Sequence, residues 1–440
     1  MEKIFGTDGI RGVVGEKITE DFILKLSKSV ACFLNKDDKK KKVLIAHDTR
    51  PSYKMIEEIF SNTLNEFGID VVCGGVMPTP CVHYLTASCG FDLAVMITAS
   101  HNPSEYNGVK IITCDGLKAS EEMEEEITKI FYADLKKPVS KEKGETTFDV
   151  NLIFKWAEKI KEICGEKLNG MKIALDCANG ASHMIAPKIF KELGAEVFVI
   201  NNSDNGKLIN KNCGSTHLEA LCKHTKNIGA DIGFAFDGDA DRVNACYSNG
   251  QPMLGEELMF LCVRLLMKNN LLGKNTIVTP NVTNFGIDQS LEKLDVKTVR
   301  VGVGGKNIQE RLISENLSYG AEDNGHIVWG DYNKCSDGIL TAVLISKFLK
   351  QEKSFDVILK DLKLLKQSKV NVYITENQKQ KFLNGESLEK EQQIQNINKD
   401  YRIIVRASGT EPLIRIIVEG QEQQKADEIS AELEKIIKDL

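Results

Sequence analysis

Three aspartates near the middle of the chain are spaced so that they can share a cation. Asp237, Asp239 and Asp241 alternate with Gly238 and Ala240, directly after an apolar run typical of a buried strand. In an extended segment a period of two points alternate side chains the same way, so we expect the carboxylates to converge. Anions that close repel one another and take up protons unless a cation neutralises them. Oxygen-only ligation of this kind suits Mg²⁺.

Other interpretations of the aspartates are weaker, and one stays open. An EF-hand loop starting at Asp237 needs Gly at its sixth position and Glu at its twelfth, where the chain has Arg242 and Ser248. A phosphatase with an aspartyl nucleophile could use Asp237 and Asp239. In such an enzyme we expect Thr or Val in place of Asp241, and a position nearer the N-terminus. An Asx-rich turn that binds no metal remains an alternative.

A serine follows another predicted strand. The apolar run Leu93 to Ile97 continues into Thr98-Ala99-Ser100-His101-Asn102-Pro103, which places a hydroxyl at the end of that strand. Ser100 and His101 are neighbours, and neighbouring side chains do not generally converge, so they do not indicate a catalytic triad. A serine that carries a phosphoryl group needs a metal and cations nearby rather than an internal base. Taken alone, the loop also fits a helix cap or a turn.

Arginines and hydroxyls gather around a glycine near the C-terminus. The segment Arg406-Ala407-Ser408-Gly409-Thr410-Glu411-Pro412 connects two predicted strands, and Arg415 follows three residues later. Arginine forks, hydroxyls and backbone N–H groups freed by a glycine are suited to anchoring a phosphate. A plain hairpin turn with surface arginines is the alternative.

Two further loops give weaker signals. Glu322 and His326 could bind sugar hydroxyls, or could simply be solvated. The N-terminal segment Phe5 to Gly12 combines three glycines with Arg11 and fits a glycine turn as well as a ligand loop.

The elements that position these loops recur three times, as strands that alternate with helices. The predicted strands are 43–46, 71–72, 93–97, 172–175, 196–200, 231–236, 276–278, 296–301 and 317–319, and the predicted helices are 51–67, 182–193, 217–228, 285–293 and 306–315. This alternation favours mainly parallel sheets, in which ligands collect at the carboxyl ends of strands. We therefore expect three α/β domains that each contribute one polar loop to a shared cleft.

The C-terminal part follows a different pattern. Strands are predicted at Val370 to Ile374, Arg402 to Val405 and Leu413 to Val418, and a terminal helix carries apolar side chains on one face. This pattern predicts a small α+β domain. Linkers are predicted at 138–147, 248–252 and 366–369. The resulting domains are 1–147, 148–250, 251–366 and 367–440.

The composition excludes several classes of protein. Lys and Arg total 57 against 63 Asp and Glu, a net charge of −6 that gives no general attraction to nucleic acid or an anionic membrane. The apolar run Leu258 to Met267 is too short to span a bilayer, and the N-terminus lacks the apolar run of a signal peptide. The 12 cysteines include no C-x-x-C motif, so we expect reduced thiols in a cytoplasmic protein.

Together, these segments resemble the diagnostic loops of the α-D-phosphohexomutase superfamily, in the same order and along nearly the whole chain. The matching segments are the serine loop (Thr98 to Pro103), the metal loop (Asp237 to Arg242), the sugar loop (Glu322 to His326) and the phosphate loop (Arg406 to Arg415). The resemblance implies three similar α/β domains with mainly parallel mixed sheets and a smaller C-terminal α+β domain, all around one central cleft.

The resemblance also implies an isomerase that moves a phosphoryl group within a sugar phosphate. Ser100 would carry the phosphoryl group, and Mg²⁺ would be held by Ser100, Asp237, Asp239 and Asp241. His101, Lys110 and Arg11 are candidates for proton transfer and charge stabilisation. As a base, Lys110 would need a lowered pKa, which a neighbouring arginine could supply. The implied substrate-binding residues are Arg242, Glu322, Asn324, His326, Arg406, Ser408, Gly409, Thr410 and Arg415.

Within the superfamily, Phe5 to Gly12 and Ser408 to Arg415 are most similar to bacterial phosphoglucosamine mutases. That similarity implies interconversion of glucosamine 6-phosphate and glucosamine 1-phosphate through a phosphoserine enzyme and a bisphosphate intermediate. The expected partners are a hexose or hexosamine phosphate and either a hexose bisphosphate activator or an activating kinase. We expect a monomer or homodimer that binds neither nucleic acid nor a membrane.

Three departures from that group keep a phosphomannomutase/phosphoglucomutase with the same mechanism as an alternative. The serine loop begins with Thr98 where Ser is more frequent, Asn324 replaces a usual Ser, and Gly305-Lys306 replaces Asp-Arg. We expect Lys306 to lie beside the sugar and, as a point charge, to orient a phosphate less firmly than arginine does. A sugar-phosphate hydrolase and a non-catalytic sugar-phosphate binding protein are more distant alternatives.

Overall fold

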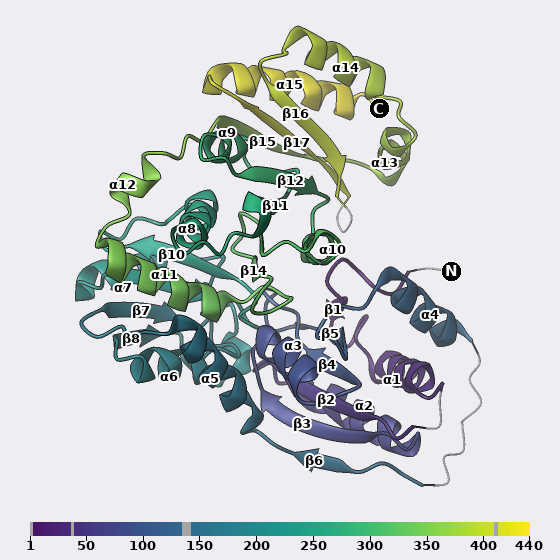
Figure 1. The fold of residues 1–440 in the computed structure, drawn as a ribbon. Coiled ribbons are helices and arrows are strands. Elements are labelled where there is room, and N and C mark those ends of the chain that lie inside the picture. Colours follow the sequence, from purple (N-terminus) through teal and green to yellow (C-terminus); the bar gives the residue numbers. More distant parts are fainter. Residues whose placement is uncertain (1–2, 37–38, 134–141, 409–411) are drawn as a thin grey trace. The chain divides into compact units, whose positions relative to one another are not determined.

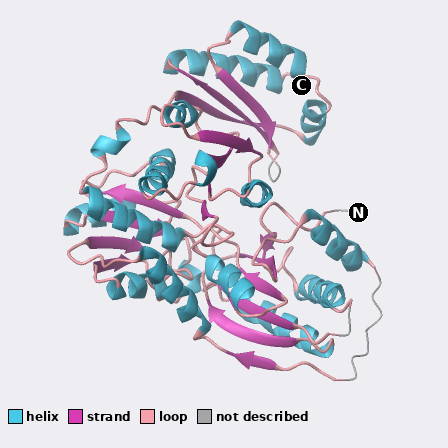
Figure 2. Cartoon of the chain, in the orientation of Figure 1, coloured by secondary structure: helices cyan, strands magenta, loops and turns pink. Residues whose placement is uncertain are grey.

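The computed structural model describes residues 3–36, 39–133, 142–408 and 412–440. The chain forms two compact units, one of Met1–Pro280 with Val299–Asp356, the other of Asn281–Thr298 with Val357–Leu440 (Figure 1). Strands alternate with helices through most of the chain (Figure 2). Within the described ranges, no helix combines the length and apolar character needed to cross a membrane.

A six-stranded sheet in the first unit has the strand order β1-β5-β4-β2-β3-β6. Its strands are β1 (Ile10–Val13), β2 (Lys42–His47), β3 (Asp70–Val76), β4 (Leu93–Ile97), β5 (Tyr106–Thr113) and β6 (Thr146–Phe148). The accompanying helices are α1 (Glu20–Leu34), α2 (Tyr53–Glu66), α3 (Thr79–Ser88) and α4 (Glu121–Tyr132). Strands β4, β2, β3 and β6 run parallel, whereas β1 and β5 pair in antiparallel fashion. Helix α1 contacts α2 and α4 over a buried apolar core.

The next sheet has the order β10-β9-β7-β8. Its strands are β7 (Lys172–Asp176), β8 (Glu196–Ile200), β9 (Ile232–Phe236) and β10 (Val243–Tyr247). The helices around it are α5 (Leu152–Cys164), α6 (Ile185–Glu192), the 3₁₀ helix η1 (Gly206–Leu208) and α7 (Glu219–Ile228). Strands β7, β8 and β9 are parallel, and β10 joins β9 in antiparallel fashion. All five residues of β9 are buried, so the metal loop begins where a core strand ends.

The third sheet has the order β12-β11-β13-β14. Its strands are β11 (Thr276–Pro280), β12 (Lys297–Val301), β13 (Tyr319–Ala321) and β14 (Ile327–Trp329). The helices of this region are α8 (Gly255–Lys268), the 3₁₀ helix η2 (Gly273–Asn275), α9 (Gly286–Glu292), α10 (Gly305–Glu315), α11 (Gly338–Glu352) and α12 (Asp356–Leu359). Strand β13 runs parallel to β11 and antiparallel to β14, and the sugar loop connects β13 with β14.

The second unit contains an antiparallel sheet of order β15-β17-β16. Its elements are β15 (Lys366–Tyr373), α13 (Glu376–Leu383), α14 (Leu388–Ile397), β16 (Arg402–Ala407), β17 (Leu413–Gly420) and α15 (Gln423–Lys438). The apolar side chains of α15 pack on the sheet, as its one-sided pattern predicts. Residues 281–298 are held to this sheet by buried Glu419, which accepts hydrogen bonds from Arg402 Nη1 (2.9 Å) and Phe285 N (3.2 Å).

The predicted strands and helices of the three repeats are confirmed, with ends that differ by a few residues. The linker predicted at 366–369 is wrong, because these residues begin β15. The polar residues of segment 366–369 hid the strand pattern, although buried and exposed side chains alternate along most of β15. Of the linker predicted at 138–147, Thr146 and Thr147 belong to β6 and residues 138–141 lie outside the described residues. Segment 248–252 is a turn, closed by a hydrogen bond from Tyr247 N to Gln251 O (2.9 Å).

Candidate active site

The serine loop and the metal loop meet through a direct hydrogen bond. Ser100 Oγ donates to Asp237 Oδ2 over 2.7 Å, and both side chains are buried. The two loops follow the buried strands β4 and β9. Because parallel α/β sheets gather ligands at the carboxyl ends of strands, this is the expected place for a reacting group.

The metal loop is a turn and not the extended segment that we expected. Ala240 has a left-handed φ of 55°, and its N–H donates to Asp237 O over 3.1 Å. One carboxylate oxygen from each of Asp237, Asp239 and Asp241 nevertheless lies within 4.8 Å of the others. The predicted convergence is therefore confirmed, but its physical reason is wrong: a chain reversal at Ala240 brings the carboxylates together, and the period of two does not.

The buried carboxylates fit a divalent cation that prefers oxygen ligands. Oδ1 of Asp239 and Oδ1 of Asp241 are buried, and in the described part of the chain neither has a hydrogen-bond partner. Burial, followed by the charges of Asp241 and Asp239, raises the pKa of Asp237 well above its ordinary value. Such a shift is expected where carboxylates crowd together without enough positive charge. A Mg²⁺ ion would supply that charge.

Lys110 of β5 forms ion pairs with two of the aspartates. Its Nζ lies 2.7 Å from Asp239 Oδ2, 2.8 Å from Asp241 Oδ2 and 3.1 Å from Asp8 Oδ2. Burial lowers the pKa of Lys110, but the three carboxylates raise it more, so the pKa lies well above its usual value. Arg11 acts in the lowering direction, as we expected, without reversing this balance. The lowered pKa that Lys110 would need in order to act as a base is therefore absent in this arrangement.

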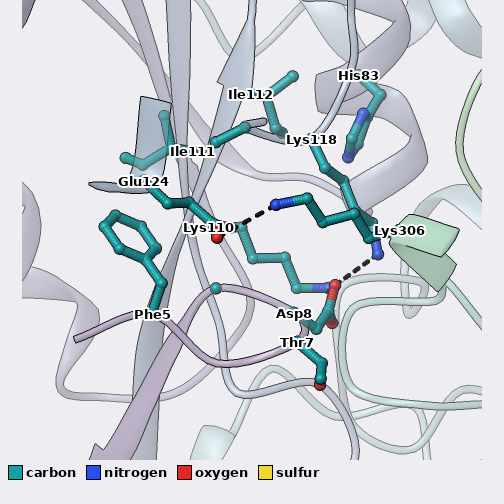
Figure 3. Close-up of a pocket in the computed structure, with 12 residues that line it drawn as sticks. Phe5, Thr7, Asp8, His83, Lys110, Ile111, Ile112, Lys118, Glu124 and Lys306 are labelled. Atoms are coloured by element: carbon teal, nitrogen blue, oxygen red, sulfur yellow. Dashed lines mark hydrogen bonds and ion pairs between the residues drawn. The ribbon is translucent and has the colours of Figure 1, made fainter. Parts of the chain in front are cut away.

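Asp8 of the N-terminal loop is a member of the site that the sequence analysis missed. Its carboxylate forms ion pairs with Arg11, with Lys110 and with Lys118, whose Nζ lies 2.6 Å from Asp8 Oδ1 (Figure 3). Burial raises the pKa of Asp8, but these cations together hold it well below the usual value. Asp8 thus fixes two of the predicted catalytic cations, Arg11 and Lys110. The available signal was an acid between glycines in Phe5 to Gly12.

Lys306 does not lie free beside the sugar loop, as we expected. Its Nζ lies 3.1 Å from Oε2 of Glu124 on α4, and both side chains are largely buried (Figure 3). The pair borders a cavity of about 20 Å³ that Asp8 and Lys118 also line. Lys306 therefore joins α10 to α4, and its charge is already compensated.

The sugar loop packs against the start of α10. Glu322 Oε1 accepts a hydrogen bond from Gly304 N (3.1 Å), and Oε2 accepts one from Asn324 Nδ2 (3.2 Å). Asn324 Oδ1 in turn accepts from His326 N over 3.0 Å. His326 Nε2 is buried and has no hydrogen-bond partner among the described residues. It lies where a Cβ of Gly305 would come within 2.3 Å of it, so this glycine makes room for the imidazole.

A backbone hydrogen bond joins the sugar loop to the first residue of β10, which directly follows the metal loop. Val243 N donates to Gly325 O over 3.1 Å. Near this junction, burial lowers the pKa of Arg242, but Asp241 and Asp237 raise it above its usual value. Burial, reinforced by Arg242 and Arg11, lowers the pKa of His101 to about 4, so its imidazole is neutral at neutral pH. Three of the four predicted loops therefore meet within the first unit.

The phosphate loop lies in the second unit. Arg406 and Arg415 are opposite each other on β16 and β17, an arrangement of like charges that destabilises a sheet unless an anion compensates it. Burial and Arg415 lower the pKa of Arg406, whose buried Nε has no hydrogen-bond partner in the described ranges. Ser408 N donates to Leu413 O over 2.9 Å. Gly409 and Thr410 lie outside the described residues.

A buried serine beside an aspartate cluster, on successive α/β sheets, is compatible with phosphoryl transfer, and comparison with known proteins identifies the family. The matching family models, all named phosphoglucomutase/phosphomannomutase, are alpha/beta/alpha domain I at residues 2–137, domain II at 155–250, domain III at 254–364 and the C-terminal domain at 357–436. The chain belongs to this family, within the α-D-phosphohexomutase superfamily. It is 37% identical over 445 residues to the phosphoglucosamine mutase of Clostridium tetani and 38% identical over 443 residues to that of Clostridium botulinum strain Alaska E43, covering 99% of each chain.

Solved structures share the fold. A phosphoglucomutase/phosphomannomutase family protein from Burkholderia thailandensis superimposes with a TM-score of 0.82 at 20% identity, covering 99% of this chain and 97% of that one. The Aspergillus fumigatus N-acetylphosphoglucosamine mutase, solved with GlcNAc-6P and magnesium, gives a TM-score of 0.68 at 17% identity over 99% and 95% of the two chains. Identities this low establish the common architecture alone.

Proposed function

We propose that the protein interconverts glucosamine 6-phosphate and glucosamine 1-phosphate, as an isomerase that passes through a phosphoserine enzyme and a bisphosphate intermediate. The observation that best supports this proposal is the 2.7 Å hydrogen bond from Ser100 Oγ to Asp237 Oδ2, beside two further buried carboxylates. Full-length similarity to phosphoglucosamine mutases, at 37% and 38% identity, supports the amino sugar as substrate.

In this proposal Ser100 is the carrier. The free hydroxyl of the sugar phosphate attacks the phosphoryl group on Ser100 and gives up its proton to the site. The bond from phosphorus to Oγ breaks, Ser100 Oγ takes up a proton to become a hydroxyl again, and a sugar bisphosphate results. The bisphosphate turns over in the site and returns its other phosphoryl group to Ser100 Oγ. His101, Lys110 and Arg11 serve proton transfer and charge stabilisation. Lys110, held by Asp239 and Asp241, acts as a protonated cation in the arrangement described above.

The proposed cofactor is Mg²⁺, held by Asp237, Asp239 and Asp241 together with Ser100. The Oδ1 atoms of Asp239 and Asp241 support this assignment, because they accept no hydrogen bond from the described residues and buried carboxylate oxygens require a compensating charge. A bound Mg²⁺ ion withdraws charge from the phosphoryl group during transfer.

Substrate binding is proposed for two further sets of residues. Arg242, Glu322, Asn324 and His326 contact the sugar hydroxyls in both orientations of the substrate. The phosphate already on the sugar is held by Arg406, Ser408, Gly409, Thr410 and Arg415. The opposed Arg406 and Arg415 support an anion site on the second unit. We also propose that domains 1–147, 148–250, 251–366 and 367–440 each supply one loop.

A comparison of substrates on one preparation tests the proposal. Turnover of the 6- and 1-phosphates of glucosamine, glucose and mannose is measured with Mg²⁺ and a hexose bisphosphate, together with release of inorganic phosphate. We expect the glucosamine phosphates to have the highest kcat/KM and phosphate release to be minor. Faster turnover of glucose or mannose phosphates would favour the phosphomannomutase/phosphoglucomutase alternative. Stoichiometric phosphate release would favour a hydrolase.

A further inference from the structure

Ser100 is held in a backbone conformation that is uncommon for a serine. Its φ is 51°, in the left-handed region, and its side chain is fully buried. Residues in such conformations persist when their surroundings fix them, and they are concentrated at functional sites. The direction of Ser100 Oγ toward Asp237 depends on this backbone conformation, so the groups that hold the backbone also determine where the hydroxyl lies.

Arg50 holds the serine loop from the first sheet. Its guanidinium is fully buried and donates to the carbonyl oxygens of Ser100 (2.9 Å), Asn102 (2.6 Å), Tyr106 (2.9 Å) and Pro103. Its Nε donates to Asp48 Oδ2 over 2.9 Å, so the charge is paired. A planar fork with five donors can satisfy several carbonyl oxygens in this way, and a lysine cannot.

Thr98 extends the same network to the amide of Ser100. Thr98 Oγ1 donates to Asp48 Oδ2 over 2.7 Å and accepts from Ser100 N over 2.9 Å. Both the N–H and the carbonyl group of Ser100 are therefore fixed by side chains.

Asn210 approaches the same loop from the second α/β region. Its Nδ2 donates to Ser100 O over 2.8 Å and to Asn102 O over 2.9 Å, so each of these carbonyl oxygens receives one bond from Arg50 and one from Asn210. Gly238 of the metal loop closes the space, since a Cβ there would lie 2.6 Å from Ser100 O and 2.9 Å from Asn210 Nδ2. The side chain of Asn210 is thus enclosed between the serine loop and the metal loop.

We infer that Arg50 and Asn210 are a positioning pair for phosphoryl transfer, an inference that rests on the proposed function. Among the described residues, neither side chain forms a hydrogen bond with Ser100 Oγ or with the carboxylates of the metal loop. Both donate to the backbone carbonyl oxygen of Ser100. Loss of the hydrogen bonds from either side chain leaves Ser100 and the three aspartates chemically unchanged. It allows the backbone of Ser100 to move, so that Oγ is no longer directed toward Asp237. Asn210 makes the alignment of Ser100 depend on the region that supplies the aspartates.

Asn210→Gly tests the pair, and Asn212→Gly is its matched control. Both asparagines lie in one loop with left-handed φ values, 56° and 53°, so glycine suits either backbone. Asn212 is exposed, whereas Asn210 is buried and bonded to the serine loop. We expect Asn210→Gly to lower kcat about tenfold or more with KM changed less than about twofold, and Asn212→Gly to match the wild type. Arg50→Lys, which keeps the charge beside Asp48 and loses the fork, should lower kcat in the same way.

Thermal unfolding and circular dichroism of each variant separate positioning from simple destabilisation. The inference is overturned if kcat, corrected for the folded fraction, falls no more in Asn210→Gly than in Asn212→Gly. A wild-type protein that turns over no hexose phosphate contradicts the proposed function alone. The pair is then judged by the rate at which glucose 1,6-bisphosphate loads a phosphoryl group onto Ser100, measured by intact mass. Equal loading rates in Asn210→Gly and Asn212→Gly would then refute it.

Discussion

Ser100 Oγ and Asp237 Oδ2 form a 2.7 Å hydrogen bond although 137 residues separate them in the chain. A phosphoryl group on Ser100 would bring a charge of about −1.5 to −2 against a carboxylate whose pKa is already raised by burial and by its acidic neighbours. The carrier and the cation site therefore depend on each other. Without a cation on the aspartates, a phosphorylated Ser100 is repelled by the group that now accepts its proton.

Ser100→Ala should abolish turnover and leave folding and sugar-phosphate binding intact. Alanine differs from serine only by the missing hydroxyl group, so only the carrier atom is lost. Ser104→Ala, four residues further along the same chain, is the control. Intact-protein mass should show one phosphoryl group on part of the wild type and of the control, and none on Ser100→Ala. Substantial mutase activity in Ser100→Ala would disprove the carrier role.

Asp239→Asn should lower kcat at least about a hundredfold, since a neutral amide cannot replace a carboxylate around Mg²⁺. The fold should persist, because Asp239 is crowded by like charges and an amide relieves that crowding. A chelator should reduce wild-type turnover in the same way, with recovery on addition of Mg²⁺. Asp204→Asn, at an exposed position, serves as the control. Full activity in the chelator would show that the aspartate cluster is not a metal site.

The sequence predicted the parallel core because its buried strands are apolar runs between helices, as in β4 and β9. It did not predict the antiparallel strands β5 and β10, which pair with those core strands and carry or adjoin functional residues. The family resemblance named Lys110 as a candidate, but nothing in the sequence indicated its place beside Asp239 and Asp241. That place depends on the antiparallel pairing of β5 with β4, in which Lys110 is opposite Met96.

The positioning residues were missed for a related reason. Asp48 and Arg50 follow the carboxyl end of β2, which is the kind of position that indicated the other loops. Arginines are mostly exposed in proteins, however, so nothing in the sequence indicated that Arg50 is buried. Asn210 gave no local signal, because its partners Ser100 and Asn102 lie more than a hundred residues away. Long-range polar contacts of this kind follow from the fold and not from local pattern.

The stability of the first unit should fall below about pH 6.5 because His83 is buried in neutral form. Burial lowers the pKa of His83 to about 3, and its Nδ1 lies 2.8 Å from Gly116 O. The unfolded chain takes up a proton near pH 6.5 and the folded chain does not, so the stabilisation is present above that pH and is lost as pH falls toward about 3. At pH 5 the loss is about 2 kcal/mol.

His83→Gln isolates this contribution, since the amide can still donate to Gly116 O but does not titrate. The free energy of unfolding in urea is measured near pH 7 and near pH 5 for both proteins. We expect the difference between the two pH values to shrink by about 2 kcal/mol in His83→Gln. An unchanged difference would show that His83 is not the group responsible, and His47, whose pKa burial lowers to about 4, would be examined next.

Gly305→Ala should impair sugar binding without weakening the fold. A Cβ at position 305 would lie 2.3 Å from His326 Nε2 and 3.0 Å from its Cδ2, so the imidazole must move away from α10. Gly305 is the first residue of α10 and does not have a left-handed φ, so alanine suits its backbone and the melting temperature should change little. We expect KM for the preferred hexose phosphate to rise about tenfold, equivalent to about 1.4 kcal/mol of binding free energy. Gly302→Ala, where a Cβ would meet only the side chain of Asn307, is the control.

In the double variant Gly305→Ala/His326→Ala the added methyl group has no imidazole to displace, so it should cause no further loss beyond His326→Ala. Additive losses would mean that Gly305 acts on the substrate independently of His326.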